Sequence, residues 1–401
     1  MTQANPHSEG RTPMTTDVLT EPVRLADIAY TEIPEVLLDP ARRHDCLFLF
    51  DVENGNPNGD PDAENSPRTE GIHGHGIVTD GCLKSKLRNL IREYGGAETF
   101  IQPAIPLNNH IRDAVVAAGG NLAEVTLDEQ DGDHDGLTDI LNHIDSLDDF
   151  VVDGNKVTYT GAQAKKSHID KALKGELPTD SPIWKAISSQ KLGSRLESAL
   201  KGKKSGVTDE VRQAAEVEMV RRFADVRYFG AVMSTGLNAG QRRGPVQIVP
   251  ATSIDPIYPM EMAITRQAKT TAERLAKSRT EIGRRSMVTY ALYRGHMFYN
   301  APLGIQNGMT ADDMRLLWES MMRMFTLDHA AGRAMMRMRG LYVWSHKSRY
   351  GDAPFDRLFD MVKVAKIVKS ETEIPRSFED YQINVGELEP NDRIVFTRLI
   401  G

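Results

Sequence analysis

The pattern of apolar and polar positions predicts a strand, an irregular loop and a helix near the start of the chain. Cys46–Val52 is a short continuous apolar run, which suits a central strand. The next stretch, NGNPNGDPDAENSPRTEG, is too dense in Asn, Pro, Gly and Asp to be regular structure. Thr79 then fits a helix N-cap, with Asp80 in the first turn. Apolar residues recur at helical spacing along this helix, at Leu83, Leu87, Leu90 and Ile91.

The same helix carries basic residues on its other side. Lys84 and Arg88 are four residues apart and so share a face, and Lys86 and Arg92 flank it. On the pattern alone, this is a solvated basic face.

The last third of the chain predicts strand, helix, strand. SMVTYALYRGHMFYN is typical of a strand, and RGLYVWSH is apolar enough for a core strand. Between them, MTADDMRLLWESMMRMF predicts an amphipathic helix capped by Thr310. Core packing is a sufficient explanation for its apolar stripe, which consists of Met314, Leu317, Trp318, Met321 and Met324.

In the middle of the chain, Ala224–Ile248 predicts an apolar strand that leads into a pair of arginines bracketed by glycines. Gly236, Gly240 and Gly244 surround Arg242 and Arg243. Small residues allow a phosphate backbone to approach the main chain, and guanidinium groups donate forked hydrogen bonds to phosphate oxygens. The alternative is a hairpin turn whose arginines face only water. In both cases we expect a loop at a sheet edge.

The stretch after this turn begins with two prolines. Pro256 and Pro259 exclude a central strand there. The following charged sequence contains Lys269, Arg274, Lys277 and Arg279.

Composition bounds the class of protein. The 401 residues, with 40% hydrophobic residues, allow one large domain with insertions or two modest ones. No run approaches the roughly 18 apolar residues needed to span a bilayer, and residues 1–20 lack a signal-peptide core, so we expect a cytoplasmic protein without a membrane partner. The two cysteines, Cys46 and Cys82, are expected to be reduced and buried.

Charge is distributed unevenly along the chain. The formal net charge of -7 argues at first against nucleic acid binding. However, residues 124–153 contain eleven carboxylates and no Lys or Arg, whereas residues 221–294 contain thirteen basic and five acidic residues. A basic face can therefore hold phosphates while an acidic insertion faces solvent or a basic neighbour.

Metal and catalytic motifs are weak. Residues 131–142 place acids at positions one, three, five and nine of a calcium loop, but Asn142 stands where the bidentate Glu belongs, so an acidic surface loop and no metal site are expected. His73 and His75 lack other ligands at zinc spacing. No catalytic triad spacing is present, and Asp60 and Asp62 in the Pro-rich loop are the acids that a nuclease could use.

Several motifs occur in a fixed order along residues 46–94, 224–300 and 338–359. They are Asn56-Pro57-Asn58-Gly59-Asp60-Pro61, Pro67-Arg68, Thr79-Asp80, Cys82-Leu83-Lys84, Asp225-Val226-Arg227, Phe229-Gly230 and Arg243-Gly244-Pro245-Val246-Gln247. Each is weak alone, but together they resemble the guide-RNA-binding backbone subunit of type I CRISPR Cascade complexes, a branch of the RAMP superfamily, closest to type I-C.

The resemblance implies an α+β fold with an RRM/ferredoxin-like core, the palm, and large insertions that form a finger and a thumb. The core would comprise residues 44–100 and 221–401. A mostly helical, finger-like insertion with an acidic loop would occupy residues 101–220, and a thumb-like arm residues 251–285. Residues 1–43 would be a disordered or extended tail.

The resemblance also implies function. The chain would be a non-catalytic subunit without cofactors that binds crRNA, multimerises with copies of itself into a helical filament and presents the guide for pairing with target DNA in antiviral defence. Other Cascade subunits, the small 5′-handle-binding subunit and the large subunit, would be partners. The RNA-binding residues would be Asn58, Arg68, Lys84, Lys86, Arg88, Arg92, Arg227, Arg242, Arg243, Gln247, Lys269 and Arg274.

Two alternatives stay open. Related subunits of type III complexes cut RNA with a loop aspartate, so the chain could be an endoribonuclease of the same superfamily that processes or cleaves RNA. It could also be a structural filament protein without nucleic acid.

Overall fold

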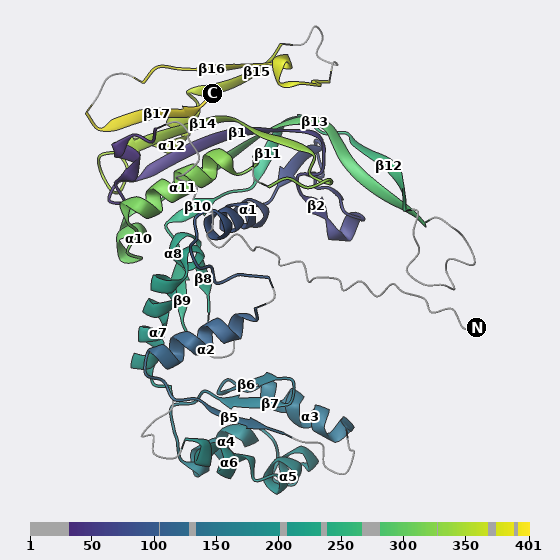
Figure 1. Ribbon diagram of the computed structural model, residues 1–401, viewed down its shortest axis with the longest axis vertical. Coiled ribbons are helices and arrows are strands. Elements are labelled where there is room, and N and C mark those ends of the chain that lie inside the picture. The colour runs from purple at the N-terminus through teal and green to yellow at the C-terminus, as the bar shows by residue number, and fades with distance from the viewer. Residues whose placement is uncertain are drawn as a thin grey trace, which may run out of the picture.

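The computed structural model describes residues 32–103, 105–127, 134–200, 207–233, 239–266, 281–326, 328–367, 374–388 and 392–401. It is an α+β structure in which one large antiparallel sheet lies at one end and a smaller, mixed region at the other (Figure 1). Among the helices within these ranges, none is both long and apolar enough to cross a membrane.

The large sheet is built around β1 (His44–Gly55), the apolar run predicted as a central strand. β1 pairs antiparallel with β13 (Glu281–Tyr299) on one side and β14 (Met335–His346) on the other. β17 (Ile394–Ile400) extends the sheet beyond β14, and β11 (Ala251–Pro256) and β4 (His75–Val78) extend it beyond β13. β10 (Val246–Ile248) and β12 (Pro259–Arg266) also pair with β13.

Two long helices, α1 (Asp80–Glu93) and α11 (Ala311–Arg323), cover one face of this sheet (Figure 1). The predicted caps are confirmed: the Thr79 side chain accepts from the Cys82 amide, and Thr310 and Asp313 form a capping box. Both predicted apolar stripes are buried in the main core. The short helix α10 (Ala301–Gln306) joins β13 to α11.

The opposite face of the sheet is also covered. α12 (Phe355–Phe359) and the two-stranded sheet of β15 (Val362–Lys366) and β16 (Tyr381–Val385) lie over it, next to the 3-10 turn η4 (Phe378–Asp380). They bury aromatic residues that the sheet presents on this side, including Tyr290, Tyr342 and Trp344. Both faces of the large sheet are therefore at least partly covered by other elements of the chain.

The N-terminal segment differs from the prediction of a tail over residues 1–43. From Ile33 onward the chain packs on the core, with a 3-10 turn η2 (Glu35–Leu38) whose Leu37 is fully buried. The indole Nε1 of Trp318 donates to the Leu37 carbonyl at 2.9 Å. A single turn, even with three apolar residues, is too short to give a periodic signal, which explains why this docking was missed. Residues 1–31 lie outside the described ranges.

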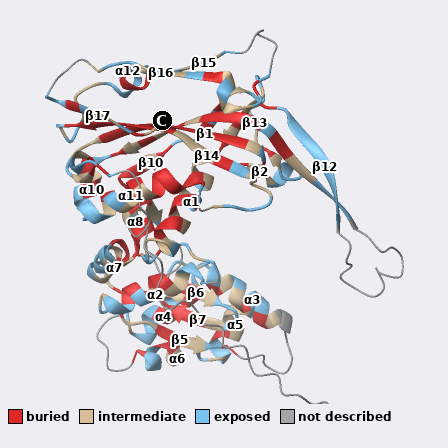
Figure 2. Cartoon of the chain, turned by 45° about the horizontal axis from the view of Figure 1, so that its top comes forward, coloured by how far each residue is buried: buried red, intermediate tan, exposed pale blue. Residues whose placement is uncertain are grey.

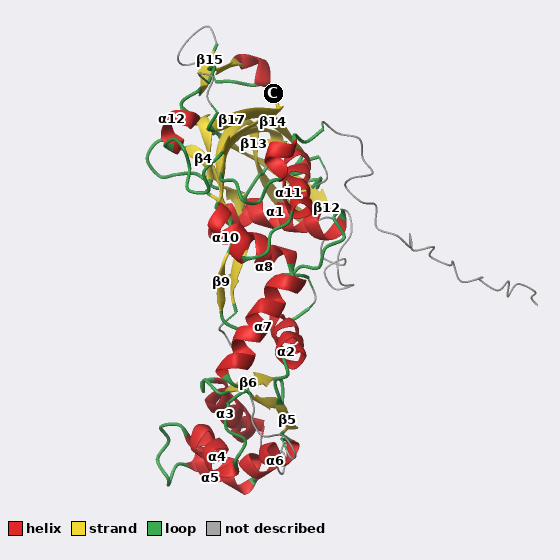
Figure 3. Cartoon of the chain, turned by 90° about the vertical axis from the view of Figure 1, so that its left-hand side faces the viewer, coloured by secondary structure: helices red, strands yellow, loops and turns green. Residues whose placement is uncertain are grey.

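Residues 101–220 extend away from the large sheet (Figure 3). One hydrophobic core lies wholly within them, and a second is shared with Phe100 and with residues of α8 and the β8–β9 segment. The helices are α2 (Leu107–Ala117), α3 (His134–Asp145), α4 (Lys166–Lys174), α5 (Pro182–Ser189), α6 (Leu192–Ala199) and α7 (Asp209–Arg222). A three-stranded sheet of β5 (Ala123–Thr126), β6 (Phe150–Asp153) and β7 (Lys156–Tyr159) accompanies them, which the sequence did not predict. The first residues of the calcium-like loop, 131–133, lie outside the described ranges.

The segment after α7 corrects a second expectation. Ala224–Phe229 forms a short helix, α8, rather than a strand, and Gly230 ends it with φ of 78°. Short apolar runs fit a buried helix or a strand equally well, so periodicity does not decide between them. β8 (Gly230–Val232) and β9 (Gln241–Arg243) then pair antiparallel, so the two arginines lie in a strand of a two-stranded sheet and not in the loop that the sequence predicted. Residues 234–238 lie outside the described ranges.

β12 and the first part of β13 form a two-stranded arm that extends from the sheet (Figure 2). The prolines do not prevent strand formation here, since Pro256 is the last residue of β11 and Pro259 the first of β12, positions where proline is tolerated. Lys269, Arg274, Lys277 and Arg279 lie outside the described ranges. The Pro-rich loop, in which no regular structure was expected, contains three short elements, β2 (Gly59–Asp60), η3 (Pro61–Ala63) and β3 (Ser66–Pro67).

Candidate nucleic-acid interface

Asn58 ties the Pro-rich loop to the beginning of α1. Its Oδ1 accepts from both the backbone amide and the hydroxyl of Thr79, each at 2.9 Å, and its carbonyl accepts from the Arg68 amide at 3.1 Å. The Arg68 guanidinium lies 3.5 Å from Asp60 and is one-third exposed. Asn58 therefore positions the loop, while Arg68 stays accessible at its surface.

The four basic residues of α1 have different environments. Lys84 pairs with Asp80 at 3.0 Å, and Arg92 bonds to Asn89 and Glu93. Lys86 is buried and paired with Asp328. The fourth, Arg88, is bonded to Asp225 at 2.9 Å with only 14% of its side chain exposed. On the face predicted for Lys84 and Arg88, Lys84 thus pairs with an exposed carboxylate and Arg88 with a buried one.

Asp225 is the centre of the contacts around Arg88. Its carboxylate is 3% exposed and accepts from the backbone amides of Phe100 at 2.6 Å and Ile101 at 3.0 Å as well as from Arg88. These bonds join α1, α8 and the first residues of the inserted region. The Arg88–Asp225 pair therefore connects the core to the insertion.

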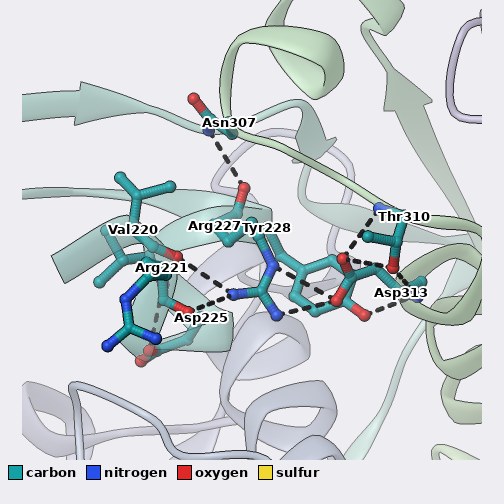
Figure 4. A network of polar contacts seen from close by, with 9 residues as sticks. Val220, Arg221, Asp225, Arg227, Tyr228, Asn307, Thr310 and Asp313 are labelled. Atoms are coloured by element: carbon teal, nitrogen blue, oxygen red, sulfur yellow. Dashed lines mark hydrogen bonds and ion pairs between the residues drawn. The ribbon is translucent and has the colours of Figure 1, made fainter. Parts of the chain in front are cut away.

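A second network surrounds Arg227, in a cleft between α7, α10 and α11 (Figure 4). Arg227 donates to Asp313 at 2.8 Å and to the carbonyls of Val220 and Arg221, both at 3.1 Å. The Tyr228 hydroxyl donates to the Asp313 carbonyl at 2.7 Å, and burial together with the nearby Asp313 carboxylate raises the pKa of Tyr228 well above its ordinary range. All three nitrogens of the Arg227 guanidinium are engaged within the protein.

The arginine pair of the hairpin divides between two sides. Neighbouring residues of a strand point to opposite faces. Arg242 donates to Asn307 at 2.7 Å, to Glu216 at 3.0 Å and to the Gln306 carbonyl at 2.8 Å, so it holds the hairpin against α7 and α10. Arg243 is exposed, and its guanidinium makes no hydrogen bond or ion pair to any described residue.

Gln247 follows Arg243 on the same side of the molecule. Its Nε2 donates to the Gly244 carbonyl at 2.8 Å, which fixes the amide beside the turn. Gly244 itself approaches α8 so closely that a Cβ would lie 2.2 Å from the Phe229 carbonyl carbon. The glycines thus serve packing between α8 and β9, in addition to any approach by a phosphate backbone.

The described residues hold no group of three or more His, Cys, Asp or Glu side chains arranged for a metal ion. The two cysteines are free, as predicted, with Cys46 buried and Cys82 partly buried. Burial raises the pKa of the Cys46 thiol, so it stays protonated and is a poor nucleophile.

The chain is an α+β protein with a large antiparallel sheet and an inserted region. It belongs to the family described as CRISPR-associated protein Cas7, whose model matches residues 42–386. A CRISPR-associated protein Cas7 of Haloferax volcanii is 42% identical over 53 residues, which span 13% of this chain and 16% of that protein.

Two solved structures are also similar. A chain of a "CRISPR RNA-guided surveillance complex, pre-nicking" has a TM-score of 0.43 with 15% identity, over 79% of this chain and 81% of that chain. A chain of a "CRISPR RNA-guided surveillance complex" has a TM-score of 0.37 with 14% identity, over 79% and 80%.

Proposed function

We propose that the chain is a non-catalytic, crRNA-binding backbone subunit of a type I Cascade complex, closest to type I-C. It assembles head to tail along one guide RNA and presents the guide for pairing with target DNA. The crRNA, neighbouring copies and the other Cascade subunits are its partners. Membership of the Cas7 family over residues 42–386 carries this proposal, because the match includes the inserted region and every strand of the large sheet except β17.

The order of elements supports an RRM-like palm. In chain order β1, α1, β11, β13, α11 and β14 follow a β-α-β-β-α-β plan, and their strands lie in the sheet in the order β14, β1, β13, β11. However, RRM domains stack bases on their open sheet face, whereas α12, β15 and β16 cover that face here. We therefore place the RNA on the surface formed by α1 and the loops around it.

The arm supports the role of a thumb. Met260, Met262 and Ile264 alternate along β12 and are each 40 to 43% exposed. Residues at spacing two lie on the same face of a strand. An exposed apolar face on a projecting hairpin suits contact with the next copy. Heterologous contacts of this kind generate open helices whose length the RNA would set.

The environment of the loop acids supports a non-catalytic role for Asp60. Its carboxylate accepts from the Asp62 amide at 3.2 Å and lies beside Arg68, so it acts as the cap of η3. If the chain were an endoribonuclease of the superfamily, incubation with labelled RNA would yield shorter products, and Asp60→Asn would abolish them. We expect intact RNA with both proteins.

The test of the proposed function is binding of RNA by the purified protein. We expect short RNA to co-purify with the chain and, after its removal, an added guide to bind with strong salt dependence and little dependence on its spacer sequence. Protein that carries no RNA and binds no added guide at low salt would overturn the proposal. Assembly into filaments without RNA would favour a structural filament protein.

A further inference from the structure

A cavity of about 360 Å³ lies where β13 ends and the loop after β14 begins. Three arginines from separate segments line it, namely Arg43, Arg243 and Arg349. Tyr350 and Phe355 contribute exposed aromatic rings, and Gln247 an amide. None of the described residues that line the cavity is acidic. The cavity falls at the small end of the usual range of about 300 to 1,000 Å³ for ligand sites.

The positive charge of this cavity comes mainly from two of the arginines. Arg43 is committed to the buried carboxylate of Asp45, to which it donates at 2.9 and 3.1 Å. By contrast, the guanidinium groups of Arg243 and Arg349 have no hydrogen bond or ion pair with any described residue, and both side chains are exposed. Arg243 and Arg349 thus place two unneutralised cations at one cavity, with five N–H donors each for an anion.

The loop that carries Arg349 and Tyr350 is held in place by its own bonds. Arg43 donates to the Tyr350 carbonyl at 3.0 Å, and the Tyr350 amide donates to the Ser348 hydroxyl at 3.2 Å. Asp352 accepts from the Ser348 amide at 2.8 Å. Gly351, with φ of 101°, makes the turn that brings the loop over Arg43. Because the backbone is already ordered, binding would cost little loop entropy.

The aromatic rings are exposed despite this order. Tyr350 is 75% exposed and Phe355 is 48% exposed, and Phe355 packs edge-on against Phe298 with ring centroids 5.4 Å apart. Exposed rings beside unpaired guanidinium groups are the combination by which proteins hold single-stranded nucleic acid, with a base on the ring and its phosphate on the cations. An acidic peptide would need the cations but would leave the rings without a partner.

We propose that this cavity binds one nucleotide of a single strand, with the phosphate between Arg243 and Arg349 and the base against Tyr350 or Phe355. The site is separate from the α1 surface and adds Arg349, Tyr350 and Phe355 to the residues that contact nucleic acid. This inference rests on the proposed function, in which the crRNA is the single strand that the cavity would bind.

The test is ligand-observed NMR titration of the nucleic-acid-free, full-length protein with AMP, adenosine and inorganic phosphate. We expect AMP to bind more tightly than adenosine or phosphate, because only AMP engages ring and cations together. Arg349→Ala and Tyr350→Ala should each weaken AMP binding about tenfold, within the range for loss of one stacked base or one charged contact. Tyr350→Phe, which keeps the ring, should bind within about twofold of the parent.

Arg357→Ala is the matched control, since Arg357 is an exposed arginine on α12 outside the cavity. It should leave AMP binding unchanged. Circular dichroism and the melting temperature should be the same for all four variants, because the substituted side chains are exposed. Equal affinity for AMP in Arg349→Ala and the parent, or an equal loss in Arg357→Ala, would overturn the proposal. The proposal would also fail if an acidic peptide with the sequence of residues 139–153 bound more tightly than AMP and the same variants weakened this binding. The cavity would then be a protein-docking site.

The same variants separate this proposal from the proposed function. If Arg349→Ala and Tyr350→Ala lose AMP but the intact chain fails to bind any guide RNA, the pocket stands and the backbone role fails. If the parent binds guide RNA but not AMP, the pocket fails and the backbone role stands.

Discussion

Lys84 and Arg88 share a face of α1, yet the structure predicts that they act in different ways. Arg88→Ala should destabilise the protein, whereas Lys84→Ala should leave the fold intact and weaken RNA binding. The reason is that the carboxylate paired with Arg88 is buried, whereas the one paired with Lys84 is exposed. The Arg88 side chain is 14% exposed and its partner Asp225 is 3% exposed, while Lys84 is 20% exposed and its partner Asp80 is 45% exposed.

The magnitudes follow from these environments. Removing Arg88 leaves the Asp225 carboxylate buried with backbone amide donors as its remaining partners. Breaking a buried ion pair on one side typically costs about 3 to 5 kcal/mol. The backbone bonds to Asp225 persist, so we expect about 3 kcal/mol for Arg88→Ala. The Lys84–Asp80 pair is an i,i+4 pair near the surface, and its loss should cost only about 0.3 to 0.5 kcal/mol.

Urea unfolding followed by circular dichroism measures the stability of both variants. Asp225→Asn supplies a second comparison, because in the Arg88→Ala background it removes the uncompensated charge and should restore part of the lost stability. Filter binding over a range of salt concentrations then measures RNA contacts. Lys84→Ala should reduce the slope of log affinity against log salt by roughly one.

Equal stability losses in the two single variants would refute this account of α1. A salt slope unchanged in Lys84→Ala would remove the helix from the RNA interface. Stability unaffected by Arg88→Ala would show that the pair with Asp225 does not join the core to the insertion in solution.

Three further predictions concern the rest of the molecule. Deletion of residues 1–31 should leave the melting temperature nearly unchanged. Leu37→Ala should cost about 2 to 5 kcal/mol in urea unfolding, because its side chain is fully buried; unchanged stability in Leu37→Ala would show that η2 does not pack on the core. Burial lowers the pKa of His44 from 6.5 to about 4. The neutral imidazole therefore contributes its full stability above pH 6.5, and the protein loses up to about 3 kcal/mol as the pH falls toward 4. His44→Gln should reduce this loss of stability in acid, and the same dependence of stability on pH in the variant and the parent would contradict the prediction. Replacing Met262–Arg284 by a short Gly-Ser linker should preserve the fold and binding to a short RNA but reduce cooperative binding to a long one in mass photometry, and undiminished long assemblies would show that the arm does not join copies.

The core elements could be predicted because their signals are local. The apolar run at Cys46, the stripe of α1 and the cap at Thr310 each lie within one segment, and the structure confirms them. The Leu37 docking and the helix at Ala224 gave no such signal. A single turn has too few residues for a period, and a short apolar run fits either conformation.

The candidate site was harder to predict because its geometry depends on distant residues. The sequence predicted the same RNA-binding role for Arg227, Arg242 and Arg243, because it does not show which distant residues contact each of them. Arg227 pairs with Asp313 and Arg242 with Glu216, while Arg243 is exposed. Arg349 could have been noticed from the aromatic and basic residues around it, yet only the structure brings it to the same cavity as Arg243. Whether these residues bind RNA stays a prediction.

The number of copies bound to RNAs of different length tests the central claim most directly. Mass photometry of the nucleic-acid-free protein, mixed with one guide-like RNA and with another twice as long, counts the copies in each complex. The proposed backbone role predicts separate subunits without RNA and about twice as many copies on the longer RNA. A single copy on both RNAs, or assemblies whose size does not depend on RNA, would contradict it.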